Sequence, residues 1–151
     1  MDIKSGCGYP ASALSNFAPH PFTFRGVPCN SMEGFLQGLK FENPDMQKYV
    51  CTLVGYAAKK KGKFKNWQES QTLYFQGVAI KRDSDEYQKL LDEAYEALAK
   101  NSSFRAALLA TQNAVLEHSI GRSKTNETVL TRSEFCGRLM RLREQMKQGQ
   151  L

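Results

Sequence analysis

The spacing of apolar residues predicts a chain built mostly of helices. Apolar positions recur every three or four residues along most of its length, which is the spacing of one buried helix face. The expected helices run from residue 30 or 31 to about 41, from 44 to near 55, from a cap at 83 to 98, from 102 or 103 to just before 121, and from 131 to the polar tail QGQL.

Short polar side chains stand before these apolar runs, where they can accept hydrogen bonds from the free N–H groups of a helix start. The clearest start is Thr131, because Glu134 three residues later completes a capping box. Glu33 is placed to complete a similar box from Asn30. The other expected caps are Ser31 as an alternative to Asn30, Asn43 before Pro44, Asp83 with Glu86, and Ser102 or Ser103.

Strand signals are fewer and shorter. "PFTFRGVPCNS" alternates around Gly26 and predicts a small antiparallel hairpin near the N-terminus. "TLYFQGVAIKR" is either a short strand or an irregular crossing, and "AKKKGKFKNW", residues 58–67, is expected to be a helix end and a loop. Without internal repeats or a linker, residues 1–151 are expected to form one domain of the α+β class, predominantly helical.

Charge and cysteine content narrow the possible partners and location. The net charge of +6 favours an anionic partner, which could be phosphate, a nucleotide or nucleic acid. No apolar run approaches the ~20 residues that cross a bilayer, and the amino-terminal residues "MDIKSGCGYP" lack the features of an export signal, so we expect a cytoplasmic protein with no membrane partner. The four cysteines lack zinc-ligand spacing and are expected to be reduced, mostly buried thiols.

The segment "NSMEGFLQGLKF" carries candidate chemistry. Helical spacing puts Glu33, Gln37 and Lys40 on one face of an otherwise apolar run. Taken by itself, this spacing is explained if Glu33 caps the helix and Lys40 extends its side chain to water. The alternative is catalysis, because a desolvated carboxyl can protonate a leaving base or activate water, and a lysine can attack an aldehyde carbon. Gly34 and Gly38 indicate that a ligand, or only another helix, approaches this surface closely.

The order of motifs resembles the NADAR, or YbiA-like, family over nearly the whole chain. The resemblance is carried by "LSNFAPHPFTFRGVPCNSMEGFLQGLKF", "GYAAKKKGK", Trp67, "FRAALLATQNAVLEHSIG" and "EFCGRLMRLR". Its most specific part is Ser-Asn-Phe at 15–17 followed by Ser31, Glu33, Gln37, Lys40 and Phe41.

This resemblance implies a metal-independent N-glycosidase that needs no cofactor. The expected substrate holds a phosphorylated ribose joined to a base, as in ADP-ribosyl-guanine of nucleic acid, a riboflavin-pathway ribosylamine or a related NAD-derived nucleotide. Glu33 is implied as the catalytic carboxylate and Lys40 as the active-site lysine, acting through an imine to the opened ribose. The alternatives are a non-catalytic module that binds ADP-ribose or a nucleotide, and a nonspecific nucleic-acid-binding protein.

The resemblance also implies a set of substrate-binding residues. Asn16, Gln37 and Trp67 resemble residues that orient ribose and base, and Lys60, Lys61 and Lys63 lie where phosphate contacts are expected. Phe17 and Ser31 complete the set as part of the signature.

The C-terminal third departs from the family pattern, because "LEHSIGRSKTNETVLT" lacks an acidic residue followed by Trp-Gly-x-Gly. His118 could replace the missing acid as a proton carrier, or Arg122 could bind a phosphate through two hydrogen bonds. The competing explanation for His118 is a residue at a helix C-terminus, favoured there by the helix dipole.

Overall fold

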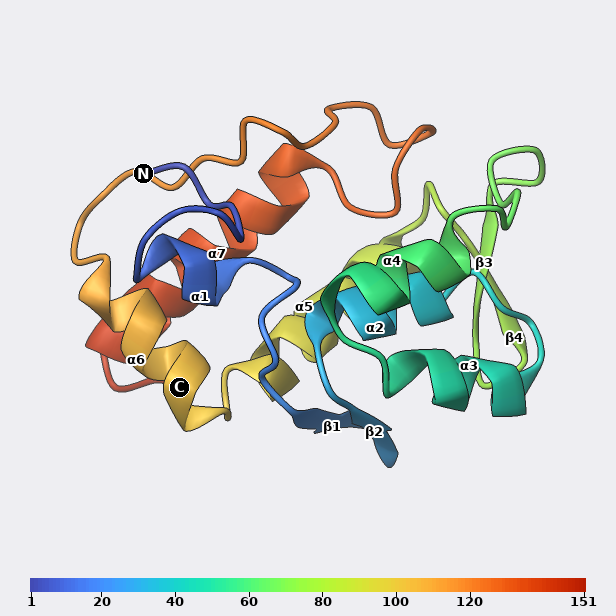
Figure 1. The fold of residues 1–151 in the computed structure, drawn as a ribbon, viewed down its shortest axis with the longest axis horizontal. Helices are drawn as coiled ribbons and strands as arrows, with labels where there is room; N and C mark the ends of the chain where they lie inside the picture. The colour runs from blue at the N-terminus through green and yellow to red at the C-terminus, as the bar shows by residue number, and fades with distance from the viewer.

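The computed structural model describes all 151 residues, and it confirms the expected predominantly helical α+β fold (Figure 1). In chain order the elements are α1 (Ala11–Leu14), β1 (Phe22–Phe24), β2 (Val27–Cys29), α2 (Met32–Gly38), α3 (Pro44–Cys51), α4 (Gly55–Gly62), β3 (Thr72–Phe75), β4 (Val78–Lys81), α5 (Asp85–Leu98), α6 (Ser102–Ala110) and α7 (Arg132–Lys147).

The helices form two groups joined by α5. Figure 1 shows α1, α6 and α7 together at one end and α2, α3 and α4 at the other, with α5 running behind and between them. One cluster of 33 buried apolar residues extends through both groups, so the chain has a single core. Three of the four cysteines are buried and all four are free thiols, as predicted. None of the helices combines the length and apolar character needed to cross a membrane.

Two antiparallel hairpins lie outside the helices. The predicted hairpin is confirmed: β1 pairs antiparallel with β2. Arg25 and Gly26 form the turn between the strands, with φ angles of 47° and 81°. A second hairpin, β3 with β4, replaces the strand or crossing that the sequence left open. Its turn has the same geometry, with φ of 51° at Gln76 and 83° at Gly77, as two-residue hairpin turns require.

The helix caps are only partly those expected. Ser31 caps α2 by accepting a hydrogen bond from the Gly34 N–H at 3.0 Å, while the Asn30 amide donates to the Thr52 carbonyl. The capping box from Asn30 is therefore wrong, which leaves the Glu33 carboxylate free for other contacts. The box at the start of α7 is confirmed. Two further caps lie one residue from the expected positions, at Ser84 for α5 and Asn101 for α6.

Three helix boundaries differ from the prediction. Helix α2 ends at Gly38, before the expected end near Phe41. Helix α3 ends at Cys51, and Gly55, with φ of 58°, begins α4, so residues 58–62 are helical. Helix α6 ends at Ala110, well before Gly121, because Gln112 adopts a left-handed conformation with φ of 54°.

Residues 111–131, which we call the arch, contain no helix, and their only strand-like pairing is an isolated bridge from Asp2 to Glu117. In Figure 1 the arch is the orange segment that runs along the top of the molecule.

Buried side chains, rather than a β-sheet, anchor the arch to the rest of the molecule. The Arg82 guanidinium is 1% exposed, donates to the Thr128 carbonyl at 2.9 Å and forms two hydrogen bonds with Glu134. The Tyr87 hydroxyl donates to the Val129 carbonyl. Burial opposes ionisation of Glu134, but the hydrogen bonds from Arg82 and Gln88 outweigh it and hold the pKa of this carboxyl below its usual value.

We expect Arg82→Met to lower the free energy of unfolding by about 3–5 kcal/mol, because it leaves the Glu134 carboxylate buried without its partner. The matched control is Arg141→Met, whose guanidinium is exposed and lies 4.0 Å from Asp92; it should change stability by less than about 1 kcal/mol. Urea unfolding at neutral pH measures both. Equal effects of the two substitutions would contradict the role of Arg82.

The two glycines of α2 serve close packing against the chain that leaves α3. A Cβ on Gly34 would lie 2.6 Å from the Leu53 carbonyl oxygen and 2.9 Å from that of Cys51, and a Cβ on Gly38 would meet the Cys51 sulfur at 3.0 Å. The close approach indicated by the sequence is therefore an intramolecular contact. It fixes the position of α2 in the molecule.

We expect Gly34→Ala to destabilise the fold by at least about 2 kcal/mol, because the backbone oxygens that it meets cannot move aside as a flexible side chain would. Gly137→Ala in α7 is the control, since a Cβ there meets nothing within 4 Å; it should stabilise the protein by about 0.5–1 kcal/mol. Urea unfolding of both variants gives the comparison. Similar effects of the two substitutions would refute the packing constraint.

Candidate active site

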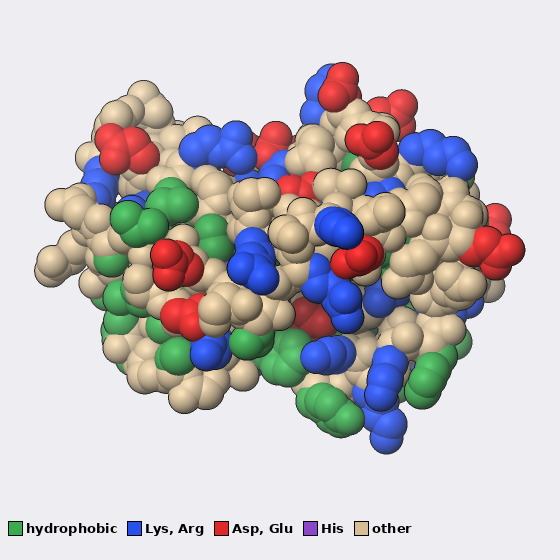
Figure 2. Space-filling view, turned by 90° about the horizontal axis from the view of Figure 1, so that it is seen from above, with side chains coloured by type: hydrophobic (Ala, Val, Ile, Leu, Met, Phe, Trp, Pro, Cys, Tyr) green, Lys and Arg blue, Asp and Glu red, His purple; other side chains and the backbone are tan.

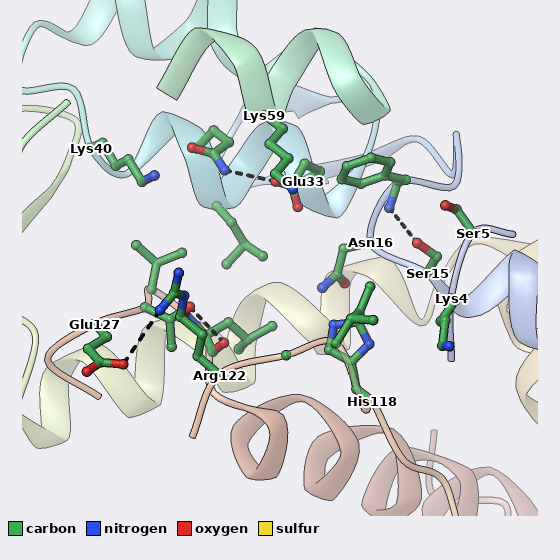
Figure 3. Close-up of a pocket in the computed structure, with 18 of the residues that line it drawn as sticks. Lys4, Ser5, Ser15, Asn16, Glu33, Lys40, Lys59, His118, Arg122 and Glu127 are labelled. Carbon is green, nitrogen blue, oxygen red and sulfur yellow. Dashed lines mark hydrogen bonds and ion pairs between the residues drawn. The ribbon is translucent and has the colours of Figure 1, made fainter. Parts of the chain in front are cut away.

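A cavity of about 420 Å³ lies between the two groups of helices. One wall comes from the loop at residues 15–17, α2 and α4, and the opposite wall from the arch and from Lys4 and Ser5 near the N-terminus. Figure 3 shows Glu33, Lys40 and Lys59 on the first wall and His118, Arg122 and Glu127 on the second. The cavity therefore brings together segments that are far apart in the sequence.

Most of the residues expected at the site from the sequence line this cavity. They are Asn16, Phe17, Glu33, Gln37, Lys40, Trp67, His118 and Arg122. Ser31 does not: it is fully buried as the N-cap of α2, and its hydroxyl donates to the Leu53 carbonyl at 2.9 Å. Ser31 thus supports the site by fixing the helix that carries Glu33.

The lysines expected to contact phosphate are arranged differently. Lys60, Lys61 and Lys63 are exposed outside the cavity, and Lys61 and Lys63 lie over the rings of Tyr49 and Phe64. Lys59 lines the cavity in their place. The sequence could have identified Lys59 as a cavity residue only if α4 had been placed correctly. Lys59 follows Gly55 by one turn, on the side of this helix that faces α2.

Glu33 is the centre of the first wall. Its N–H donates to the Asn16 carbonyl at 2.9 Å, and its Oε1 accepts a hydrogen bond from the Gln37 amide at 2.8 Å. Burial raises the pKa of the Glu33 carboxyl, while the Gln37 hydrogen bond and the charges of Lys40 and Lys59 act in the opposite direction with smaller effect. Glu33 is therefore a carboxyl that holds its proton to higher pH than usual.

Gln37 is positioned by a glycine of α4. Its Oε1 is buried without a hydrogen-bond partner, and a Cβ on Gly62 would overlap it. With Oε1 packed against the Gly62 backbone, the amide nitrogen is directed at Glu33. The absence of a side chain at Gly62 thus sets the orientation of the group that holds the carboxyl.

Lys40 follows the end of α2 and reaches the same cavity. Its Nζ lies 3.4 Å from the Gly62 carbonyl oxygen. Burial lowers the pKa of Lys40, and the nearby Glu33 charge only partly offsets this effect. Burial therefore favours the neutral form of both Glu33 and Lys40, a combination typical of acid–base sites.

Asn16 presents a hydrogen-bond donor to the cavity. The hydroxyl of the fully buried Tyr95 donates to Asn16 Oδ1 at 2.8 Å. Because that oxygen is occupied, the Asn16 amide nitrogen faces the cavity, as Figure 3 shows. Tyr95 was not anticipated from the sequence, where it belonged only to the apolar face of α5.

On the second wall, His118 and Arg122 belong to the arch. The helix-terminus explanation of His118 is wrong, since α6 ends at Ala110. His118 Nδ1 lies 2.7 Å from the Ile3 carbonyl oxygen. Arg122 is exposed, with its guanidinium 3.7 Å from Glu127, which also lines the cavity.

The cavity suits an anionic ligand that carries a ring. Four of its lining residues carry basic side chains, namely Lys4, Lys40, Lys59 and Arg122, against the carboxyls of Glu33 and Glu127. Figure 2 shows Lys and Arg side chains gathered near the middle of the face seen from above. Trp67, which is 4% exposed, and Phe17 add flat apolar surface. No group of three or more His, Cys, Asp or Glu side chains is arranged to hold a metal ion.

Comparison with known proteins places the chain in a family. The family model described as Bacteriophage protein GP30.3 matches residues 8–144. A protein of Enterobacteria phage T4, named "Uncharacterized 17.1 kDa protein in Gp30-rIII intergenic region", is 39% identical over 149 residues, which cover 97% of this chain and 98% of that protein.

The NMR structure of the E. coli protein YbiA is similar over 99% of this chain and 85% of YbiA, with a TM-score of 0.65 and 19% sequence identity. That similarity shows the fold that the sequence resemblance predicted. The chain is a member of the bacteriophage protein GP30.3 family, and it has a YbiA-like fold.

Proposed function

We propose that this protein is an N-glycosidase that hydrolyses the C–N bond between a phosphorylated ribose and a base. The observation that carries the proposal is the pairing of Glu33 and Lys40 in one cavity, where burial raises the pKa of the carboxyl and lowers that of the amine. A carboxyl whose pKa is raised by burial is suited to protonate a departing base.

In the proposed reaction Glu33 acts as acid and then as base. As the C–N bond breaks, its electron pair stays with the base nitrogen, which takes the proton of Glu33. Water then bonds to the anomeric carbon of the ribose and gives a proton back to the carboxylate. Gln37 occupies Glu33 Oε1, which leaves the second oxygen for the transfer. Lys40 would stabilise the carboxylate that exists between the two steps, because an ionised Glu33 favours the charged form of Lys40 and the charge of Lys40 favours ionised Glu33.

The remaining residues of the cavity would bind the substrate. Lys59 and Arg122, on opposite walls, are assigned to phosphate groups, and the Asn16 amide to a ribose hydroxyl. Trp67 and Phe17 would contact the base. A volume of about 420 Å³ falls within the range of small-molecule sites, and the substrates proposed are ADP-ribose on guanine of nucleic acid and riboflavin-pathway ribosylamines.

A module that only binds such a ligand is a weaker proposal. Binding alone gains nothing from a carboxyl next to an anionic ligand, since the ionised group would repel it. Burial raises the pKa of Glu33. A raised pKa is useful to a carboxyl that transfers a proton but not to one that only binds a ligand, so it favours the enzyme.

We expect Glu33→Gln to reduce hydrolysis by about 100-fold to 10,000-fold, because glutamine cannot donate the proton. Release of ADP-ribose from an ADP-ribosylated guanine oligonucleotide, which leaves the unmodified oligonucleotide, and release of the amine from a ribosylamine measure this, with Glu96→Gln as the exposed control. The proposal fails if wild type and Glu33→Gln are equally inactive on both substrates.

The same variant should keep its stability. The raised pKa of Glu33 in the folded state means that stability is lost as pH rises through that pKa. Since glutamine does not ionise and its Oε1 can still accept from Gln37, the thermal midpoint of Glu33→Gln at pH 8 should be no lower than that of wild type.

The pH dependence of the rate should depend on Lys59. Its charge lowers the pKa of Glu33, so Lys59→Met should raise that pKa. Because hydrolysis requires protonated Glu33, the alkaline fall of kcat/KM should move to higher pH in Lys59→Met. Lys60→Met, on the exposed side of the same helix, should leave this limb in place. Superimposable profiles of the two variants would refute the coupling.

A further inference from the structure

The second wall of the cavity carries one imidazole, that of His118, whose neutral ring has a nitrogen lone pair. We propose that His118 is the base that takes the proton of the attacking water, so that Glu33 acts only as the acid. This inference rests on the proposed function and divides between two residues the roles that Glu33 would otherwise perform alone.

The imidazole ring is fixed on three sides. Its Nδ1 lies 2.7 Å from the Ile3 carbonyl oxygen, and the ring packs edge-on against Phe135 at 5.2 Å between centroids. A Cβ on Gly121 would lie 2.6 Å from His118 Cδ2, so the backbone of Gly121 closes the third side. The one ring nitrogen left without a protein partner is Nε2.

The Ile3 carbonyl also determines which nitrogen is protonated. A carbonyl oxygen can only accept, so the hydrogen bond requires a proton on Nδ1. In the neutral ring Nε2 then carries the lone pair. His118 lines the cavity, and Figure 3 shows it on the wall opposite Glu33. A base and an acid thus face the same space from opposite sides.

The proposed step conserves protons and electrons. The nucleobase leaves with the electron pair of the C–N bond and the proton of Glu33. Water bonds through its oxygen to the anomeric carbon from the other side, and its proton passes to His118 Nε2. The products are the ribose with a new hydroxyl at the anomeric carbon and the nucleobase with a new N–H. Exchange with solvent then returns the proton from the His118 imidazolium to the Glu33 carboxylate.

Several charged groups surround the imidazole. Glu33 faces it across the cavity, and the two charges interact. Lys4 lies on the N-terminal segment that contacts it, Asp2 is hydrogen-bonded to the adjacent Ser119, and Arg132 lies beside Gly121. Since both signs are present, the pH profile must be compared between variants that leave these groups unchanged.

His118→Asn separates a catalytic role from a structural one. The amide of asparagine can still donate to the Ile3 carbonyl, but it cannot accept a proton as imidazole does. The matched control is His20→Asn, because His20 is the other histidine of the chain, also hydrogen-bonds a backbone carbonyl, that of Ala13, and lies outside the cavity.

With the ADP-ribosylated guanine oligonucleotide and the ribosylamine as substrates, we expect His118→Asn to lower kcat by about 100-fold or more with little change in KM. The rise of kcat/KM with pH on the acidic side should disappear, while the alkaline fall due to Glu33 remains. His20→Asn should behave as wild type. Wild-type kcat and an unchanged acidic limb in His118→Asn would overturn the proposal.

A second measurement does not depend on turnover. Long-range ¹H–¹⁵N correlation spectra of the intact protein at alkaline pH should show His118 as the Nδ1–H tautomer, and the Nε2–H tautomer would overturn the assignment. The two proposals fail differently. Inactivity of the wild type on both substrates removes the proposed function and the role of His118 with it. An active wild type with an unaffected His118→Asn variant removes only the role of His118.

Discussion

The site depends on a buried ion pair that holds a segment without regular structure. Arg82 is the largest fully buried side chain, and its guanidinium bonds both the Glu134 carboxylate and the Thr128 carbonyl. Burying these charges is unfavourable unless every donor and acceptor is matched. Here the matching partner is the arch itself, so the wall of the cavity that carries His118 and Arg122 can dock in one arrangement.

The opposite wall is built by local helix geometry instead. Ser31 caps α2, the Asn16 carbonyl receives the Glu33 N–H, and Gly34 lets the helix lie directly on the chain after α3. This rigid frame retains two unfavourable features, the desolvated carboxyl of Glu33 and the unpartnered Oε1 of Gln37. Such features persist where a packed scaffold enforces them, and they are typical of functional sites.

Local signals predicted the parts of the fold that are determined by neighbouring residues. The capping box of α7, the hairpin at Gly26 and the helix carrying Glu33 were all recognisable from the sequence. Helix α4 was missed because its buried face is made of glycine and alanine, which give no apolar periodicity. The same omission concealed Lys59.

The arch was missed for a different reason. Its conformation depends on partners far away in the sequence, such as Ile3 for Glu117 and Arg82 for Thr128. No short stretch of the sequence contains both members of these pairs, so the apolar spacing of "LATQNAVLEHS" predicts a continuation of the preceding helix. The difference between the walls also bears on function. A change at Gly34 must displace backbone, whereas the exposed side chains of Ile120 and Arg122 can change without disturbing the core. For the proposed N-glycosidase, the helical wall would fix the position of Glu33, and the exposed positions Ile120 and Arg122 of the arch are where a different substrate would be accommodated.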